Sequence, residues 1–555
     1  MNGAHAVVRA LKQEGVSHIF GLPGTTIMNI IDALAQQSEI RYISTRHEQV
    51  AAFMADGFAR GSGELGVCLA SRGPGAANMT IGVHNAYAES VPVLALLGQV
   101  ADEIYYREAF EEMDLVKFYE PITKWAMEIH DAARIPELLQ RAVRTALSGR
   151  KRPVMVSVPL DAQLEELDQV KFQPRFRHAQ PLPPQGEVAR ALQMLQQARQ
   201  PVILLGGGSL TSGAHESVAV LADRLEIPVI TTWLRKDAFP NGDEHFFGSL
   251  GFGAPPITDE LAASADVILA VGCHFSEFTS RRWTLFSERT KFIHVENDPE
   301  ELGKIYVPAI GLQGDAGMTV AMMVEMLDGF AVQDEAVQSR KEWMRQIRPR
   351  YTAETTLPLS RSNGEGAVSS AAVVQALQHV LDNYTSLLVQ DAPTFGVWIQ
   401  KYLNFDRPGR FFAAAGGSMG WGLPASFGIQ LARPDERVIT VAGDGAFWMV
   451  AQDLETAVRE DIPVVTLVTN NFSYGNTRDR QRSAHDGRYL GVFYNNPDFA
   501  AFARLLGAHG ERVVRDEDLI PAVERALASG KPAVVDVIQG KFEGLPEGLT
   551  PPEAK

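Results

Sequence analysis

Cysteine is almost absent from this sequence of 555 residues, which contains only Cys68 and Cys273. Two cysteines cannot form a disulfide framework, and such scarcity fits a reducing compartment. No apolar run reaches the roughly 18 residues that a membrane-spanning helix needs. The N-terminus also lacks the basic and apolar regions of a signal peptide. We therefore predict a cytoplasmic protein that does not enter the membrane.

The sequence has fewer basic residues than acidic residues. The 51 Lys and Arg residues against 67 Asp and Glu residues give a net charge of −16. This balance argues against a nucleic-acid-binding surface, which needs clustered basic side chains. Hydrophobic residues make up 45% and charged residues 21% of the chain, as in an ordinary globular enzyme. At this length we expect roughly three domains and small-molecule partners.

A local pattern of a helix, a proline and a short Val/Ile/Leu run recurs along the chain. Proline is tolerated at the start of a strand, and continuous apolar runs indicate strands that are covered on both faces. Alternation of such strands with helices predicts an α/β fold with parallel sheets. The pattern occurs at 91–97, 152–158, 200–205, 227–230, 462–465 and 531–537.

Two polar, proline-containing stretches, 171–187 and 350–365, interrupt this alternation and are interpreted as linkers. They predict domains at 1–170, 185–330 and 365–555. The first and last of these also look alike, because 65–98 and 438–471 both follow the order strand, glycine turn, helix, strand. We expect a ligand to bind across the interface of these two similar domains.

The most informative motifs lie in the last third. Gly443-Asp444-Gly445 follows one apolar run, and Asn470-Asn471 follows the next, with a helix predicted over 446–460. Parallel strands joined in this way present their C-terminal ends side by side, so Asp444 and Asn471 should face one crevice. Their oxygens are ligands that Mg²⁺ prefers, and the glycines allow backbone to approach a phosphate. The alternative is a pair of ordinary turns.

A second candidate site lies in the first third. Glu48 follows a predicted strand and begins a helix, and Gly73-Pro-Gly75 with Asn78 follows the next strand. A glutamate in the first turn of a helix is common for electrostatic reasons alone, so it could have only a structural role. Combined with the distant metal motif, it is a candidate for catalysis.

Together these motifs resemble the thiamine-diphosphate-dependent decarboxylase and carboligase family, and most closely its acetolactate-synthase-like members. The resemblance spans nearly the whole chain. It is carried by Gly21-Leu-Pro-Gly24, Arg46-His-Glu48, Gly73-Pro-Gly75, Ala109-Phe-Glu-Glu-Met-Asp114, Gly416-Gly-Ser-Met-Gly-Trp-Gly-Leu-Pro424, Gly443-Asp-Gly445 and Asn470-Asn471.

The resemblance implies three flavodoxin- or Rossmann-like domains that bind the pyrimidine end of thiamine diphosphate in the first domain of one subunit. The diphosphate end would bind in the third domain of another subunit, within a homodimer or homotetramer. Glu48 would hydrogen-bond the aminopyrimidine and favour the imino form that removes the thiazolium proton. The Gly417 carbonyl would accept from the exocyclic amine, and Met419 would support the bent cofactor.

The remaining site residues implied by the resemblance concern the metal and the cofactor. Mg²⁺ would be bound by Asp444, Asn471 and the backbone carbonyl of Ser473. The other cofactor-binding positions are Gly73, Asn78, Gly443 and Gly445.

Departures from the family pattern concern substrate-binding positions. Phe278 stands where acetolactate synthases carry an arginine that binds the carboxylate of the acceptor, and Arg480 replaces a tryptophan. Glu111, next to Phe110 in the first domain, stands where a glutamine is usual. Loss of a carboxylate clamp is not conservative, so we expect neutral aldehydes or ketones to be preferred to pyruvate as acceptor. Arg281, Arg282 or Arg480 are alternative sources of the missing charge.

Two further points stay open. Gly206-Gly-Gly208 follows an apolar run and could bind the dinucleotide part of FAD or form a tight turn. The predicted function is a carboligase that takes a 2-oxo acid donor and a carbonyl acceptor. The alternatives are an aldehyde lyase or carboligase that acts on 2-hydroxyketones, and a non-catalytic cofactor-binding protein, for which an activating Glu48 would be unnecessary.

Overall fold

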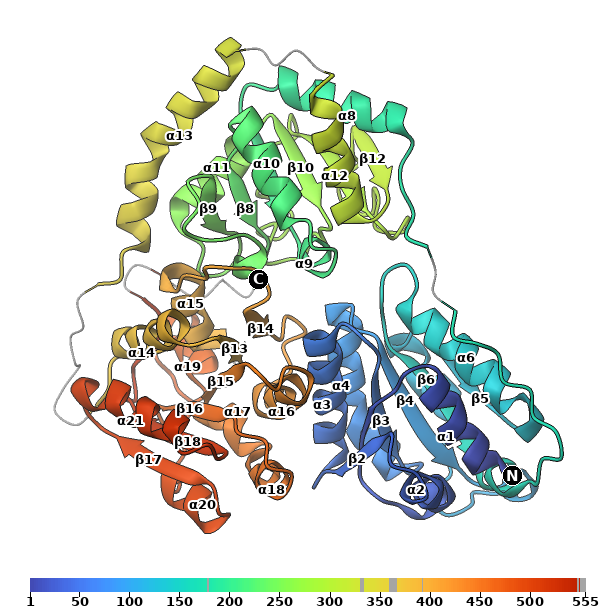
Figure 1. Ribbon diagram of the computed structural model, residues 1–555. Helices are drawn as coiled ribbons and strands as arrows, with labels where there is room; N and C mark the ends of the chain where they lie inside the picture. The colour runs from blue at the N-terminus through green and yellow to red at the C-terminus, as the bar shows by residue number, and fades with distance from the viewer. Residues whose placement is uncertain (177–178, 330–333, 359–366, 392, 547–548, 550–555) are drawn as a thin grey trace.

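Three parallel α/β domains make up the chain (Figure 1). The structure, a computed structural model, describes all residues except 177–178, 330–333, 359–366, 392, 547–548 and 550–555. Each domain contains a sheet of six strands, and every strand pair within these sheets is parallel. The predicted fold class is therefore confirmed.

The first domain has the strand order β2-β1-β3-β4-β6-β5. Its strands are β1 (His18–Gly21), β2 (Arg41–Ser44), β3 (Gly66–Ala70), β4 (Val93–Gln99), β5 (Trp125–Glu128) and β6 (Val154–Pro159). Its helices are α1 (Gly3–Gln13), α2 (Met28–Ala35), α3 (Glu48–Ser62), α4 (Pro74–Glu89), α5 (Leu115–Tyr119), α6 (Ile135–Leu147) and α7 (Leu160–Leu164).

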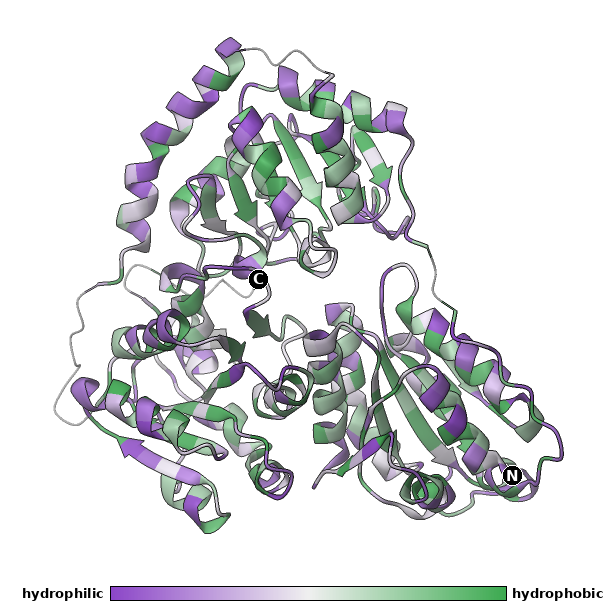
Figure 2. Cartoon of the chain, in the orientation of Figure 1, coloured by the Kyte–Doolittle hydropathy of each residue, from purple (hydrophilic) through white to green (hydrophobic). Residues whose placement is uncertain are grey.

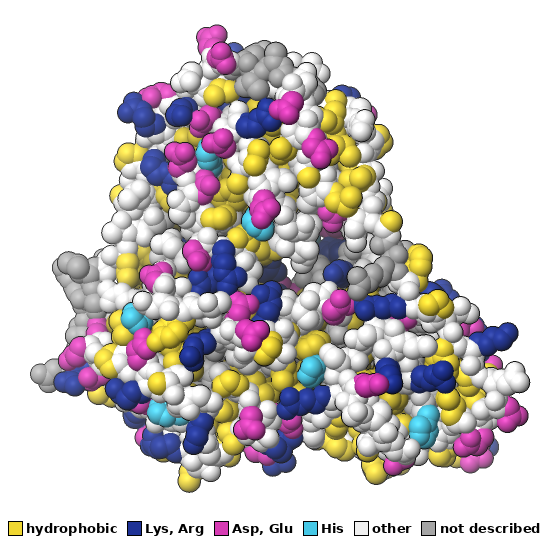
Figure 3. All heavy atoms as spheres, in the orientation of Figure 1, with side chains coloured by type: hydrophobic (Ala, Val, Ile, Leu, Met, Phe, Trp, Pro, Cys, Tyr) yellow, Lys and Arg dark blue, Asp and Glu magenta, His cyan; other side chains and the backbone are white. Residues whose placement is uncertain are grey.

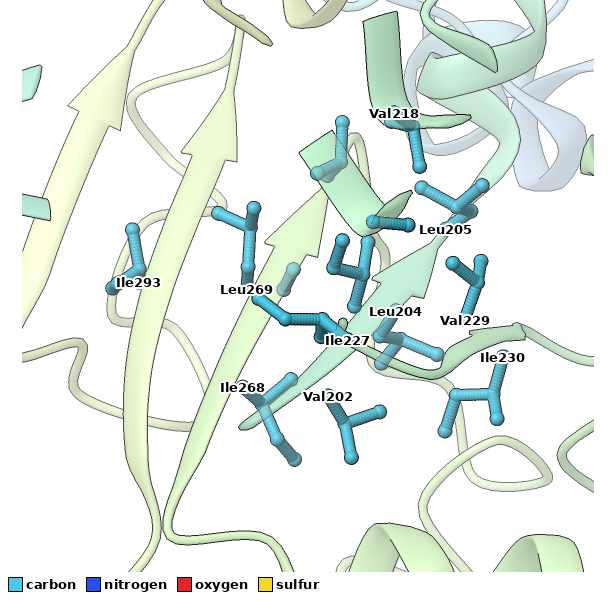
Figure 4. Packing of buried hydrophobic residues seen from close by; sticks show 14 of the residues in the cluster. Val202, Leu204, Leu205, Val218, Ile227, Val229, Ile230, Ile268, Leu269 and Ile293 are labelled. Carbon is cyan, nitrogen blue, oxygen red and sulfur yellow. The ribbon is translucent and has the colours of Figure 1, made fainter. Parts of the chain in front are cut away.

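The middle domain has the order β12-β11-β10-β7-β8-β9, which is the Rossmann order. Its strands are β7 (Pro201–Leu205), β8 (Val229–Thr231), β9 (Phe246–Ser249), β10 (Val267–Val271), β11 (Lys291–Glu296) and β12 (Ile310–Gln313). Its helices are α8 (Gln185–Gln197), α9 (Gly207–Thr211), α10 (His215–Leu225), α11 (Pro256–Ser264), α12 (Ala316–Leu327) and α13 (Asp334–Thr355). Apolar side chains from adjacent strands and α10 form its core (Figure 4).

Helix α13 overlaps the beginning of the predicted linker 350–365. Residues 350–355 were predicted to be part of a linker, but they form the last turns of α13. The buried Arg340 of this helix donates hydrogen bonds to the carbonyl oxygens of Leu225, Leu195 and Ala198. The helix therefore packs on the middle domain, beyond the predicted boundary at 330. The first linker stretch, where described, has no helix or strand between 171 and 184.

The third domain repeats the strand order of the first, β14-β13-β15-β16-β18-β17, as the similar motifs predicted. Its strands are β13 (Ser386–Gln390), β14 (Phe411–Ala413), β15 (Arg437–Gly443), β16 (Val465–Asn470), β17 (His509–Val513) and β18 (Ala533–Ile538). Its helices are α14 (Ser370–Asn383), α15 (Pro393–Tyr402), α16 (Gly422–Ala432), α17 (Asp444–Trp448), α18 (Leu454–Arg459), α19 (Gly475–Ala484), α20 (Phe499–Leu505) and α21 (Asp516–Ala528).

The single helix predicted over 446–460 is wrong in detail. The segment contains α17, the 3-10 turn η6 (Ala451–Asp453) and α18. At the break, Val450 leaves the helical region with φ −137° and ψ 9°. The break places the buried Asp453 where its Oδ1 accepts from the backbone N–H of Arg46 at 2.8 Å. Contact with the first domain thus accounts for the interruption.

The first and third domains share a buried core along α3 and α16, which lie side by side in Figure 1. A Cβ on Gly57 would lie 2.2 Å from the Ala425 carbonyl oxygen, and one on Gly428 would lie 2.1 Å from that of Met54. Only glycine permits this backbone approach.

Hydrophobic residues concentrate in the sheets. In Figure 2 the inner strands of the sheets are mostly green, which marks hydrophobic residues, and the outer faces of the helices carry purple, hydrophilic residues.

The outer surface carries charges of both signs. On the face shown in Figure 3, acidic and basic side chains are interspersed, and no broad basic patch is present. Among the described residues, no helix is both long enough and apolar enough to cross a membrane.

Candidate active site

The first half of the candidate site lies at the carboxyl ends of β2 and β3. Glu48 is the first residue of α3, and His47 caps this helix by accepting from Gln49 N–H. The Glu48 side chain is buried, and its Oε2 accepts from Asn78 Nδ2 at 3.0 Å. A Cβ on Gly75 would lie 3.2 Å from Glu48 Oε1, so this glycine leaves room for the carboxylate.

The Gly73 turn brings the first-domain loop to the same place. Gly73 has φ 54° and ψ −113°, and a Cβ there would lie 2.6 Å from the Glu111 carbonyl oxygen. Arg72 Nε donates to the Phe110 carbonyl oxygen at 2.9 Å. The Phe110 side chain itself is 78% exposed. The structure therefore places Phe110 and Glu111 beside the Gly73 turn, with Phe110 directed to the surface of the single chain.

The second half lies at the carboxyl ends of β15 and β16, which pair in the sheet. Asp444 is the first residue of α17, and its side chain is buried. Oδ1 accepts from Gly445 N–H at 2.9 Å and from the Tyr494 hydroxyl at 3.0 Å. Oδ2 accepts from Phe472 N–H and from Asn496 Nδ2, both at 2.8 Å. All four donors are neutral.

Burial raises the pKa of Asp444 to about 6, against the effect of its hydrogen bonds. Among the described residues, no basic side chain forms an ion pair with this carboxylate. A buried carboxylate in this situation is stabilised by a bound cation. Among the described residues, no group of three His, Cys, Asp or Glu side chains could hold a metal. A site here would therefore combine Asp444 with amide and carbonyl oxygens.

The two asparagines have different surroundings. Asn470 is the last residue of β16, and its Nδ2 donates to Asp536 Oδ1 at 2.9 Å. Asn471 lies beyond the strand, and its Oδ1 accepts from the N–H and hydroxyl of Ser473 at 3.1 and 3.0 Å. Asn471 and Ser473 therefore form one turn next to Asp444, whereas the Asn470 side chain connects β16 to β18.

Three residues that sequence reasoning missed support this turn. Tyr494 and Asn496 bond to Asp444, and Asn496 Nδ2 also donates to Asn470 Oδ1 at 2.9 Å. The fully buried Arg478 donates to Ser473 Oγ at 3.0 Å and to the Glu543 carbonyl oxygen at 2.9 Å. The sequence gives no spacing signal for these residues, because Arg478 lies in α19 and Tyr494 and Asn496 lie in the loop after it, and their side chains meet this turn only in the fold.

Gly417 and Met419 lie in the loop between β14 and α16. Gly417 is exposed, with φ 76° and no other atom within 4 Å of a Cβ built on it. Asp391, at the end of β13, accepts from Gly420 N–H at 3.2 Å and Gly422 N–H at 2.8 Å. These hydrogen bonds fix the loop just after Met419 in the chain, while the backbone at Gly417 remains exposed.

The contacts of the two halves lie at different places on the first domain. Among the described residues, no hydrogen bond or ion pair joins Glu48 or Asn78 to the Gly417, Asp444 or Asn471 regions. Asn78 lies early in α4, whereas Glu89, its last residue, accepts from Gly416 N–H at 3.1 Å. Their separation of 11 positions (89 − 78) corresponds to about 16 Å along the helix axis. Glu48 and Gly416 are therefore bound near opposite ends of α4.

The middle domain contributes a cavity of about 310 Å³ at the junction of the three domains. Phe278 lies in its wall and stacks on Trp233, with ring centroids 4.2 Å apart. Its lining also includes Arg150, which pairs with Glu301, and Arg152. Phe278, which we expect at the position of an acceptor-binding arginine, thus forms an aromatic pair in a cavity whose lining also includes Arg152 and Glu277.

The other candidate arginines differ in their partners. Arg281 pairs with Asp259, and Arg282 pairs with Glu277 at 3.1 Å. Arg480 lies on α19, after the Asn471 turn, and its buried Nε has no hydrogen-bond partner within the described part of the chain. Of the three, Arg480 is the one that forms no ion pair among the described residues.

The Gly206–Gly208 run follows β7 at the point where the strand order of the middle sheet reverses. A Cβ on Gly206 would lie 2.1 Å from the Gly272 carbonyl oxygen, and one on Gly208 would lie 2.8 Å from the Gly272 Cα. Close packing against the loop after β10 therefore explains these glycines without a ligand.

Comparison with known proteins agrees with this division into domains. Models of the N-terminal, central and C-terminal domains of thiamine pyrophosphate enzymes match residues 1–118, 188–323 and 391–537. The chain belongs to the thiamine pyrophosphate enzyme family.

Several curated relatives match over nearly their whole length. The chain is 33% identical over 569 residues to a probable acetolactate synthase large subunit of Methanocaldococcus jannaschii, covering 100% of this chain and 94% of the relative. It is 32% identical over 534 residues to the isozyme 3 large subunit of acetolactate synthase from Escherichia coli, covering 95% and 92%. This thiamine pyrophosphate enzyme is therefore a carboligase of the acetolactate-synthase-like type, which makes carbon–carbon bonds.

Proposed function

We propose that the protein is a Mg²⁺- and thiamine-diphosphate-dependent carboligase whose active sites form between two subunits. It would join the acyl part of a 2-oxo acid to an uncharged carbonyl acceptor. The observation that carries the oligomeric part is the separation of Glu48 and Gly416 along α4, because an aminopyrimidine ring is only a few ångströms wide. The exposed Phe110 beside the Gly73 turn also suits a site that a second subunit completes.

The residues present fit the cofactor. Asp444, Asn471 and the Ser473 carbonyl would hold Mg²⁺ and through it the diphosphate, since they supply hard oxygen ligands. Within the part of the chain that the structure describes, the buried Asp444 forms no ion pair with a basic side chain, which suits this role. Gly443 and Gly445 keep the start of α17 free of side chains, and a Cβ on Gly445 would lie 2.6 Å from Tyr474 Cε1. When bound, the cofactor supplies a carbon nucleophile that protein side chains lack.

The side chains of the chain itself would orient and protect this chemistry. Glu48, held by Asn78, would bind the pyrimidine nitrogen and exchange a proton with it. The Gly417 carbonyl of the partner subunit would accept from the exocyclic amine, and the half-buried Met419 would support the ring. An active Glu48 beside metal ligands is unnecessary in a protein that only binds the cofactor. This favours an enzyme over the non-catalytic alternative.

The aromatic pair of Phe278 and Trp233 underlies the proposed acceptor preference. A carboxylate next to Phe278 without a bidentate partner would be costly to desolvate. Neutral aldehydes or ketones should therefore outcompete pyruvate as acceptors. Cleavage and formation of 2-hydroxyketones is the second candidate reaction, because it needs no acceptor carboxylate. Flavin takes no part in either proposed reaction, and the absorption spectrum of the purified protein would test the FAD expectation.

A competition assay tests the acceptor proposal. The protein with thiamine diphosphate and Mg²⁺ receives pyruvate as donor and an equal concentration of aldehyde, and products are separated chromatographically. Neutral-acceptor products should dominate, and Phe278→Arg should shift the ratio toward acetolactate by roughly tenfold, the value of a gained charge-assisted pair. Acetolactate as the main wild-type product would contradict the proposal. In that case Arg480→Gln should abolish this preference, while Arg282→Gln serves as the control.

We further propose a homodimer or a homotetramer of two such dimers in the cytoplasm. The free, buried Cys68 and Cys273 suit a reducing compartment.

A further inference from the structure

A fully buried carboxylate lies where the three domains meet. Glu89 is the last residue of α4, and its side chain has no exposed surface. Its Oε2 pairs with Arg60 of the first domain and, at 2.6 Å, with Arg235 of the middle domain. Its Oε1 accepts from the backbone N–H of Gly416 in the third domain at 3.1 Å. One carboxylate thus contacts all three domains.

This group is a carboxylate at neutral pH. Burial opposes its ionisation, but Arg60 and Arg235 outweigh burial and hold the pKa of Glu89 below its usual value. The C-terminal end of a helix is an unfavourable place for a negative charge. Removing its charge would take away the carboxylate partner of Arg235, whereas Arg60 would keep Asp56 at 3.6 Å.

Two more polar links join the first domain to the same segment. Arg60 Nη1 donates to the Ala413 carbonyl oxygen at 3.0 Å. The fully buried Asp56 accepts from Trp421 Nε1 at 3.0 Å through its Oδ2. We call residues 413–421 the cofactor loop, because they contain Gly417 and Met419. First-domain side chains therefore hold this loop at its start, next to Gly417 and at its end.

Among the described residues, the third-domain side chain that bonds to the loop backbone lies at one end of the loop. Asp391 bonds to Gly420 and Gly422, beyond Met419. On the other side of Gly417, the side chains that bond to the backbone come from the first domain, Glu89 through Gly416 and Arg60 through Ala413. Since Gly417 is exposed and no atom would crowd a Cβ there, its orientation depends on these neighbours.

We propose that Glu89 is a positioning residue that sets the direction of the Gly417 carbonyl, and that Arg235 links this setting to the middle domain. The inference rests on the proposed function, in which that carbonyl accepts from the cofactor's amine. The diphosphate end is held elsewhere, by Asp444 and Asn471. A change at Glu89 should therefore reduce turnover far more than cofactor affinity, which general destabilisation would not do.

The test compares Glu89→Gln with Glu436→Gln. Glu436 also pairs with two arginines, Arg407 and Arg433, but no hydrogen bond joins it to the cofactor loop among the described residues. Glu89→Gln should lower kcat by about 10- to 100-fold, the usual effect of misplacing a reacting group by about 1 Å. Its dissociation constant for thiamine diphosphate, measured calorimetrically with Mg²⁺, should change less than about threefold. Glu436→Gln should change neither quantity.

Arg235→Met keeps the test decisive if Glu89→Gln does not fold. It removes one partner of Glu89 from a partly exposed position and leaves the core between the first and third domains intact. It should lower kcat several-fold with unchanged cofactor affinity. Wild-type kcat in either soluble variant, or a fall in affinity equal to the fall in kcat, would overturn the positioning role. Failure of the wild-type protein to bind thiamine diphosphate would instead overturn the proposed function.

Discussion

The first and third domains have the same strand order, but the acidic residue of the candidate site lies at a different position in each. In the first, the turn after β3 is Gly73-Pro74, and in the third the corresponding turn after β15 is Gly443-Asp444. Conversely, α3 begins with the acidic Glu48, whereas its counterpart α16 begins with Gly422 after the cofactor loop. Each domain carries one carboxylate of the candidate site, on a different helix.

The hydrogen-bond partners of Asp444 and Glu48 also differ. Asp444 accepts four neutral hydrogen bonds, and its pKa is raised to about 6 by burial. Glu48 accepts a hydrogen bond from Asn78, and Gly75 leaves space beside its other oxygen. The shared fold therefore determines where a site can form, while local side chains determine whether it suits a metal or an organic ring.

The largest effect is expected from the third-domain carboxylate. Asp444→Ala removes the charged metal ligand, so affinity for Mg²⁺ and thiamine diphosphate should fall by more than about 100-fold, and activity should be lost. Isothermal titration calorimetry with and without EDTA measures this. Unchanged cofactor affinity in this variant would remove Asp444 from the metal site.

Glu48→Gln should reduce turnover and leave cofactor affinity nearly unchanged, in contrast to Asp444→Ala. Glutamine keeps the size and the hydrogen bond to Asn78 but cannot exchange a proton. Turnover should fall by about 10²- to 10⁴-fold, the usual contribution of general acid–base catalysis. Cofactor affinity should remain within about fivefold of wild type, because the diphosphate site is intact. The same titration and a product assay check both values, and near-wild-type turnover would exclude Glu48 from the mechanism.

Co-expression of Glu48→Gln and Asp444→Ala subunits tests whether the two domains serve one cofactor across an interface. Random pairing places both changes in one site of each mixed dimer and leaves the other intact, so about a quarter of all sites should be active. Activity per subunit of the purified mixture, compared with each variant alone, measures this recovery. A mixture no more active than either parent, or full activity in a monomeric wild-type sample, would contradict shared sites.

A smaller effect is expected on stability from Asp56, the first-domain carboxylate that bonds to Trp421. Burial raises its pKa to about 6, above its value in the unfolded chain. The folded protein therefore binds more protons, and this contribution to stability is present below about pH 4 and lost as pH rises through about 6. Over this window the stability advantage of wild type over Asp56→Asn should fall, on the order of 2–3 kcal/mol. Denaturant unfolding at pH 4.5 and 7 checks it, and a constant difference would contradict the assignment.

The pattern of residues predicted much of this molecule. The repeated Pro and Val/Ile/Leu runs predicted parallel sheets, and the similarity of 65–98 to 438–471 predicted two domains with one strand order. These predictions succeeded because strand burial and helix alternation leave a periodic trace in the sequence. The pairing of β15 with β16 was predictable for the same reason, which brings Asp444 and the Asn471 turn to one edge. The broken helix at Val450 was not, because a contact with Arg46 far away in the chain decides it.

By itself, the sequence determined the fold class, the thiamine pyrophosphate enzyme family and the positions of Glu48, Asp444 and Asn471 at strand ends. Only the tertiary structure decided that Tyr494, Asn496 and Arg478 support the Asp444 edge, and that Glu89 joins three domains at the cofactor loop. It also placed Glu48 and Gly416 near opposite ends of α4. Local motifs record the chemistry of adjacent residues, but contacts between residues distant in the chain depend on how the domains pack, and no short pattern encodes that.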